Sequence, residues 1–203
     1  MAEMLQLWNM ALGFVGTRTV ASTDEDTPEA AQCALFWDSA RRQVLRDYPW
    51  NFARRRQWLA RAAVPAGWEG EYAAAFALPH DCLKVLEVQS GSGGRRLPYA
   101  LVHDSTRNGL WLLVNASQAL VTYTADITHV ALFDDLCAHL LARRLAALIA
   151  APLLRDNTAK INELEQLYRA ALPAAREANA AEAPRRLEHD PWLAGRGDMG
   201  GAR

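Results

Sequence analysis

The sequence lacks most of the motifs from which a catalytic, metal-binding or membrane-spanning protein is usually recognised. Its three cysteines, Cys33, Cys82 and Cys137, are odd in number, stand among apolar neighbours and form no CxxC pair. This pattern favours buried free thiols over a zinc site or a disulfide framework. No run of about 18 apolar residues is free of charge, and the opening MAEMLQLW has neither a basic start nor a cleavage site. We therefore expect neither a membrane span nor a signal peptide.

Catalytic and ligand-binding motifs are also missing. The histidines at positions 80, 103, 129, 139 and 189 have no HExxH or other metal-ligand spacing, and no GxSxG is present. GSGGRR, at residues 91–96, lacks the Lys-Ser/Thr ending of a phosphate loop. Asp134 and Asp135 are adjacent, so on a helix they diverge by about 100°. The sequence predicts no enzyme, no metal and no cofactor.

Neither sign of charge is in clear excess. The chain has 22 basic and 23 acidic residues, which gives a formal charge of −1. This balance argues against a protein that coats nucleic acid by bulk electrostatics. The charges are nevertheless uneven along the chain. An acidic cluster comprises Asp24, Glu25, Asp26 and Glu29. An arginine cluster comprises Arg41, Arg42, Arg46, Arg54, Arg55, Arg56 and Arg61. Such a gradient is typical of a subunit contact or a solvated face; the alternative is a helical nucleic-acid-binding module that uses Arg41 to Arg61.

Helical periodicity is present in both the first and the last third of the chain. In the first third, the apolar spacing of residues 5–15 predicts a short helix that ends at Gly16. Thr27-Pro28-Glu29 is a helix start signal, and Pro49 is a stop, so a second helix is expected from Pro28 to Asp47.

The stretch from Val130 to Leu154 is predicted to be the core helix, with an end near Ala151 because Pro152 removes a backbone donor. Its expected buried stripe comprises Leu132, Phe133, Leu136, Leu140, Leu145, Leu148 and Ile149. A fourth helix follows from Asn157 to Leu172, antiparallel to the third, and should kink or restart at Pro173.

The middle of the chain changes to a strand pattern. Short runs rich in valine, leucine and aromatic residues alternate with the turns SGSGG and DSTRNG, which predicts an antiparallel sheet of about six strands. At the start of this segment, Pro49 ends the second helix. Trp50 and Phe52 should point to the same side of the strand that follows and pack between the helices and the sheet. Tyr48, Pro49, Trp50 and Phe52 are thus the expected helix–sheet junction.

The predicted fold class is α+β. Residues 1–49 and 125–183 should form a four-helix bundle-like body, residues 50–124 an antiparallel β subdomain inserted between the second and third helices, and residues 184–203 an extended C-terminal tail. The tail has no periodicity but carries Trp192 and Leu193. These side chains suggest an anchor for a groove on a partner, or else a contact back onto the same domain.

Several segments in this order resemble the head-to-tail adaptor family of tailed, podovirus-like phages, of the tail tubular protein A type. The resemblance spans Met4 to Ala183 and rests on LWNMALGFVG, EAAQCALFWDSARRQVLRDYPWNFARRRQWLA, FALPHDCLKVLEV and VTYTADIT. Its most specific pieces are YPWNFA, from Tyr48 to Ala53, and LPHDCLKV, from Leu78 to Val85.

This resemblance implies a structural virion protein of the tail or neck, present in the host cytoplasm before assembly. Such adaptors form a homo-oligomeric ring, typically of twelve subunits, that joins the portal protein to the tail nozzle. DNA passes through the lumen during ejection without specific binding, and fibres or spikes can attach. The helices would build the ring, the sheet would face the nozzle, and the tail would reach into the portal. The expected portal-docking residues are Pro191, Trp192, Leu193 and Arg196. An alternative within the same setting is another neck or head-completion connector.

Overall fold

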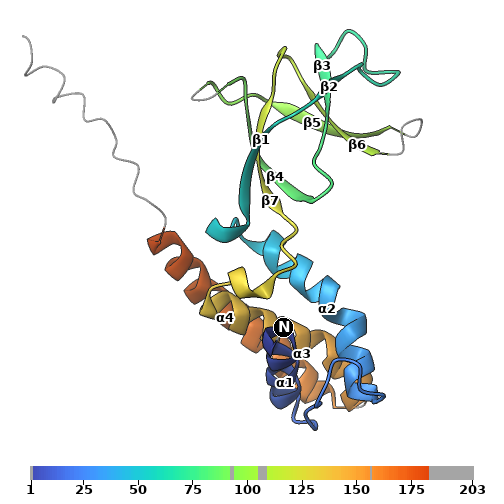
Figure 1. The fold of residues 1–203 in the computed structure, drawn as a ribbon, viewed down its shortest axis with the longest axis vertical. Helices are drawn as coiled ribbons and strands as arrows, with labels where there is room; N and C mark the ends of the chain where they lie inside the picture. Colours follow the sequence, from blue (N-terminus) through green and yellow to red (C-terminus); the bar gives the residue numbers. More distant parts are fainter. Residues whose placement is uncertain (1, 92–93, 105–108, 156, 183–203) are drawn as a thin grey trace, which may run out of the picture.

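A computed structural model describes residues 2–91, 94–104, 109–155 and 157–182. Helices gather in one half of the molecule and strands in the other, which confirms the α+β class with antiparallel sheets (Figure 1). The four α-helices are α1 (Ala2–Val15), α2 (Pro28–Asp47), α3 (Asp135–Leu154) and α4 (Thr158–Ala181). Two single 3-10 turns, η1 (Asn51–Ala53) and η2 (Val130–Leu132), lie where the chain passes between the halves.

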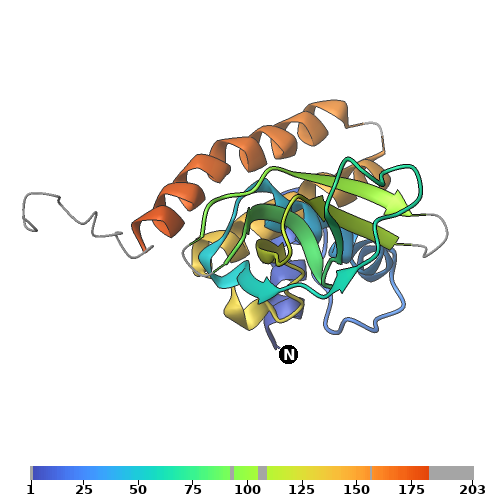
Figure 2. The same ribbon diagram turned by 90° about the horizontal axis from the view of Figure 1, so that it is seen from above.

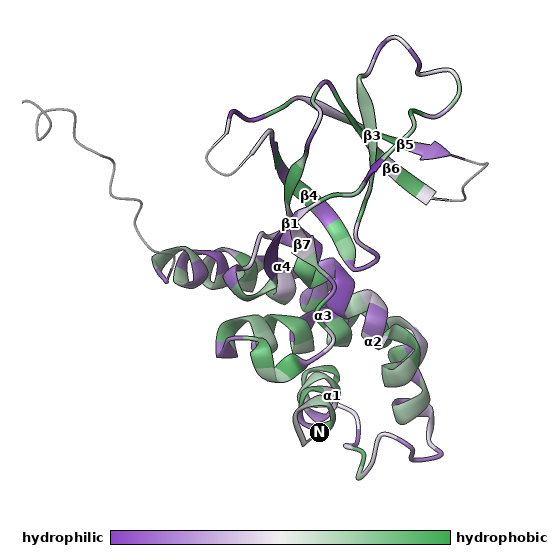
Figure 3. Ribbon diagram, turned by 45° about the horizontal axis from the view of Figure 1, so that its top comes forward, coloured by the Kyte–Doolittle hydropathy of each residue, from purple (hydrophilic) through white to green (hydrophobic). Residues whose placement is uncertain are grey.

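Helix α3 is the centre of the helical half, because α1, α2 and α4 all pack against it. In Figure 3, much of α3 and of α1 has the colour of hydrophobic residues. Its buried residues are Cys137, Leu140, Leu141, Ala142, Leu145, Ala146, Ile149 and Ala150. Small side chains among the leucines let three neighbouring helices approach one helix closely. By length and composition alone, α3 is the one described helix that could cross a membrane.

Both boundaries predicted for α3 were wrong. Residues 130–132 form η2, and α3 begins only at Asp135, because the Asp134 carboxylate caps it by accepting the Cys137 N–H at 2.7 Å. As a result Leu132 and Leu136, predicted to be buried, are 57% and 47% exposed. The helix also continues past Pro152 to Leu154. Pro152 is exposed in the last turn, where water can satisfy the carbonyl that loses its donor.

Helix α4 does not restart at Pro173, which lies within one continuous helix. The exposed position of Pro173 again leaves the freed carbonyl within reach of solvent. In the view from above, α4 runs along one side of the molecule (Figure 2). Its inner residues Leu164, Tyr168 and Ala175 are buried against the rest of the helical half.

The strand half contains two small antiparallel sheets where one was predicted. One has the order β1-β7-β4 and the other β2-β3-β6-β5. The strands are β1 (Arg54–Trp58), β2 (Arg61–Ala62), β3 (Ala74–Ala77), β4 (Cys82–Gln89), β5 (Tyr99–Asp104), β6 (Gly109–Val114) and β7 (Leu120–Ala125). β7 is the last strand in the chain yet pairs between β1 and β4. Such long-range pairing cannot be read from local periodicity.

One apolar core runs through both halves. It joins the buried faces of the helices to Phe76, Leu112, Val121 and Tyr123 in the sheets. A smaller cluster of Ala75, Val102 and Leu113 lies on the other face of the second sheet, covered by Tyr72 and Trp111. Because the main core is continuous, buried apolar contacts hold the sheets against the helices, in addition to the chain connections between them.

Candidate functional site

The junction between the halves, which the sequence singled out, is built around one buried tryptophan. Trp50 is fully buried and donates its indole N–H to the Val44 carbonyl at 2.8 Å. Its ring meets Tyr48 edge-on with centroids 5.3 Å apart, and Phe52 follows at 6.3 Å. Phe52 then contacts Phe133, just before α3, at 4.8 Å. The aromatic series therefore links the end of α2 to the start of α3.

The backbone at this junction differs from the predicted strand. Residues 51–53 form the turn η1, and the strand begins only at Arg54. Trp50 and Phe52 therefore do not share a strand face, and their rings lie side by side with an interplanar angle of 25° because the chain turns between them. The motif YPWNFA is a compact corner, not an extended wedge.

The end of α4 is attached to the same corner by an asparagine pair. The Asn51 N–H donates to the Asn179 side-chain oxygen at 2.9 Å, and the Asn51 amide donates to the Asn179 carbonyl at 2.7 Å. Asn179 is 3% exposed. Nearby, Arg176 lies 5.7 Å from the Tyr48 ring centroid and donates to the Asp47 carbonyl at 2.9 Å. The ends of α2 and α4 thus meet at residues 47–53.

A buried arginine holds the second connection between the halves. Arg41, on α2, is 2% exposed and donates to the Ile127 carbonyl at 2.8 Å and to Asp126. Arg42 donates to the other oxygen of Asp126 at 3.0 Å. Arg41 also pairs with Asp38 at 3.0 Å. Two guanidinium groups therefore satisfy the Asp126 carboxylate where the chain leaves β7 for α3.

Other arginines of the cluster also form hydrogen bonds or ion pairs within the chain. Arg46 donates to the Leu83 carbonyl at 2.6 Å, and Arg55 pairs with Asp81 at 2.5 Å. Asp81 in turn accepts from the Tyr123 hydroxyl at 3.1 Å. Burial, and secondly the Asp81 charge, raise the pKa of Tyr123. The cluster was predicted as a subunit contact, a solvated face or a nucleic-acid site, and no sequence pattern indicated that Arg41 is buried.

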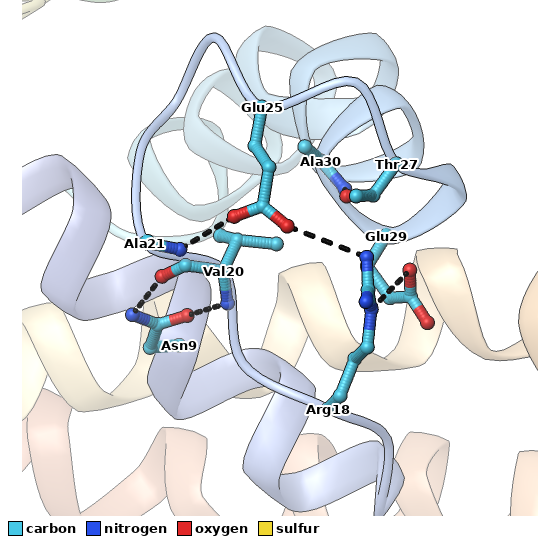
Figure 4. A network of polar contacts seen from close by, with 8 residues as sticks. All are labelled: Asn9, Arg18, Val20, Ala21, Glu25, Thr27, Glu29 and Ala30. Atoms are coloured by element: carbon cyan, nitrogen blue, oxygen red, sulfur yellow. Dashed lines mark hydrogen bonds and ion pairs between the residues drawn. The ribbon is translucent and has the colours of Figure 1, made fainter.

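The acidic cluster is part of an ordered loop between α1 and α2 (Figure 4). Glu25 accepts the Ala21 N–H at 2.6 Å and pairs with Arg18 at 3.3 Å, and Arg18 also pairs with Glu29 at 3.3 Å. The Asn9 side chain bonds both the N–H and the carbonyl of Val20, at 2.8 and 2.9 Å. The exposed acids Asp24 and Asp26 therefore stand on a fixed loop.

The described residues include all three cysteines and four of the five histidines. No group of three or more histidine, cysteine or acidic side chains among them could bind a metal. Cys33 and Cys137 are buried free thiols, as predicted, and Cys82 is half-buried. Burial raises the pKa of Cys33 to about 12 and of Cys82 to about 11, so these thiols are poor nucleophiles near neutral pH. His80, His103, His129 and His139 are exposed.

Exposed large apolar side chains occur in both halves of the molecule. In the helical half, Leu132 and Leu136 are exposed, and Leu7, Met10 and Phe133 help to line a groove of about 220 Å³. In the strand half, Tyr99, Leu101 and Leu110 are 38%, 43% and 50% exposed. The predicted portal-docking residues Pro191, Trp192, Leu193 and Arg196 lie outside the described residues.

Comparison of the sequence with protein-family models gives no match, and comparison with curated proteins gives none.

Proposed function

We propose that this chain is a structural virion protein, a head-to-tail adaptor whose ring joins a phage portal to the tail nozzle and leaves a channel for DNA. The observation that carries the proposal is the buried corner at residues 48–53. The segment that most specifically resembles the adaptor family, YPWNFA, is the one that fixes helices and sheets at opposite ends of the molecule. A connector between two different partners needs two such ends.

The finer architecture belongs to the same proposal. Residues 1–49 and 125–183 act as a bundle-like body that packs into a ring, typically of twelve copies. Residues 50–124 act as the inserted β subdomain that faces the nozzle. Residues 184–203 act as the tail that enters the portal, with Pro191, Trp192, Leu193 and Arg196 as its docking residues.

The state of the arginines favours the adaptor over the nucleic-acid-binding module. A phosphate-binding surface needs exposed cations that can neutralise phosphates and so release the counterions of the nucleic acid. Arg41 is buried. Arg42 and Arg55 are more than half exposed, but each is paired with a carboxylate of the chain, Asp126 and Asp81. A channel protein that gripped phosphates would also slow the passage of DNA.

Imaging of an assembled complex tests the proposal. The purified full chain is mixed with its portal protein and viewed by electron microscopy, beside a chain that lacks residues 184–203. We expect a ring on the portal with the full chain and weak or no docking with the shortened one. Equal docking of both chains would reject the role of the tail, and no docking of either would reject the adaptor.

A salt titration of duplex-DNA binding distinguishes the adaptor from the nucleic-acid-binding module. We expect little binding at any salt concentration from the adaptor. A steep loss of affinity with rising salt would instead support the nucleic-acid-binding module, since its slope reports the number of phosphates neutralised.

A further inference from the structure

The groove in the helical half lies between α1, η2 and the start of α3, and its volume is about 220 Å³. Its apolar lining includes Leu7, Met10, Phe133 and Ala138. Gln6 and Asp135, which are both exposed, add polar groups to the lining. Sites that enclose drug-sized ligands measure roughly 300–1,000 Å³. A smaller apolar groove with polar groups beside it therefore suits a single large side chain.

The described part of the chain ends close to this groove. Helix α4 ends at Ala181, and Asn179, in its last turn, forms two hydrogen bonds with Asn51. The next residue in the chain, Phe52, contacts the ring of Phe133, which lines the groove. Two side-chain contacts therefore join the end of α4 to the groove.

The sequence beyond α4 carries one side chain of the required kind. Trp192 is the only aromatic residue outside the described ranges, and it follows Glu182 by ten positions. An extended chain spans at most about 3.3 to 3.6 Å per residue, so ten residues reach up to about 35 Å. This reach exceeds the distance that two successive side-chain contacts cover, so Trp192 can arrive at the groove of its own chain.

We propose that, in the free protein, Trp192 and Leu193 dock into the groove between α1, η2 and α3 of the same chain. The indole ring covers the apolar lining, and its N–H has the side-chain oxygens of Asp135 and Gln6 as acceptors. Pro191 fixes a backbone angle beside this anchor, which reduces the entropy lost on docking. A buried indole is the usual energetic centre of such a contact.

The short connection to α4 favours the chain's own Trp192 over that of a second copy. A segment tethered by so few residues meets its site at an effective concentration in the millimolar range, which a second copy does not reach in dilute solution. The inference itself concerns the chain alone. If the proposed function also holds, the portal competes with the groove for the same two side chains, because they cannot occupy both sites at once.

Fluorine NMR of the full chain, labelled with fluorotryptophan, tests this inference. The chain has seven tryptophans, and the resonance that is lost in Trp192→Ala belongs to Trp192. The test variant is Ala131→Arg, which places a long charged side chain at an exposed position in the groove lining. The control is Ala151→Arg, the same change at an exposed alanine near the end of α3.

We expect the Trp192 resonance of the wild type and of the control to show the small shift between H₂O and D₂O that is typical of a buried ring. In Ala131→Arg the same resonance should show the larger shift of an exposed ring, while the other six resonances stay in place and report an intact fold. If those six show that Ala131→Arg does not fold, Gln6→Arg, at an exposed position on the α1 side of the groove, replaces it.

Three results would overturn the inference. The first is an exposed Trp192 ring in the wild type, and the second is a buried ring that the groove variant does not release. The third is burial that increases with the concentration of the chain, which favours a second copy as the occupant. Because no portal takes part, a chain that docks Trp192 in its groove but binds no portal overturns the proposed function and keeps this inference.

Discussion

The helical half and the strand half of this chain bury their residues in different ways. Around α3, three helices cover one helix, and its central leucines and alanines are fully enclosed. In the second sheet, the apolar face is enclosed along β3 and at Leu112 and Val114 of β6, but it is open at Leu110 and along β5. The contrast indicates that the helices and the corner supply most of the stability, whereas the second sheet leaves part of its apolar face exposed. The following variants test that division, from the largest expected effect to the smallest.

Trp50→Ala should have the largest effect, a loss of about 3 to 5 kcal/mol in the free energy of unfolding. The change leaves a cavity between Tyr48 and Phe52 and frees the buried Val44 carbonyl. Urea denaturation measures it. Trp58→Ala, at a 48% exposed tryptophan on β1, is the control and should change stability by about 0.5 kcal/mol. Equal losses in both variants would place Trp50 outside the core.

Arg41→Ala should cost about 2 to 3 kcal/mol, somewhat less than the loss of one partner of a fully buried ion pair, because Arg42 still contacts Asp126. The Ile127 carbonyl also loses its donor. The control is Arg42→Ala, whose side chain is 57% exposed and whose loss should cost less than about 1 kcal/mol. A reversed order of the two variants in urea denaturation would contradict the buried clamp.

Alkaline pH should weaken the fold partly through Cys33. Its pKa rises from 9.0 to about 12 because burial disfavours the thiolate, with the Glu29 charge as a second cause. The protonated thiol is therefore retained in the fold when the unfolded chain has already lost its proton. This contribution is complete below pH 9 and is lost as the pH rises toward 12. Cys33→Ala should show a shallower fall of the urea midpoint above pH 9 than the wild type. Parallel curves would exclude the contribution.

Leu101→Ala should have the smallest effect, less than about 1 kcal/mol, because the side chain is already 43% exposed. Its cross-strand partner supplies a matched comparison, since Leu112 lies opposite it and is fully buried. Leu112→Ala should cost about 2 to 5 kcal/mol. A similar loss for both leucines in thermal or urea unfolding would mean that Leu101 belongs to the core as Leu112 does.

Local signals predicted some elements closely. The second helix was expected from Pro28 to Asp47, and α2 has those bounds, with the Thr27 side chain accepting the Ala30 N–H at 3.3 Å. Its signals all lie within a few residues of the helix ends, so sequence can display them. The predicted start of α3 at Val130 was wrong because apolar residues continue through η2, whereas the capping residue Asp134 sets where the helix begins.

The candidate functional residues depend more than the helix ends do on contacts between residues that are far apart in the sequence. Tyr48, Trp50 and Phe52 were singled out from the sequence, but the turn that brings their rings together was not. Arg41 was grouped with surface arginines, because its partner Asp126 is 85 positions away. The exposed apolar side chains of β5 were not foreseen at all, since YALVHD has the pattern of any half-buried strand.

The sequence by itself determined the helices with clear caps, the antiparallel strand content and the position of the aromatic corner, because propensity, capping and periodicity act over a few residues. Only the tertiary structure decided that the strands divide into two sheets, that Arg41 is enclosed and that β5 is an open edge. Each of these depends on which distant segment covers a side chain or pairs with a backbone, and that choice is made by the packing of the whole chain.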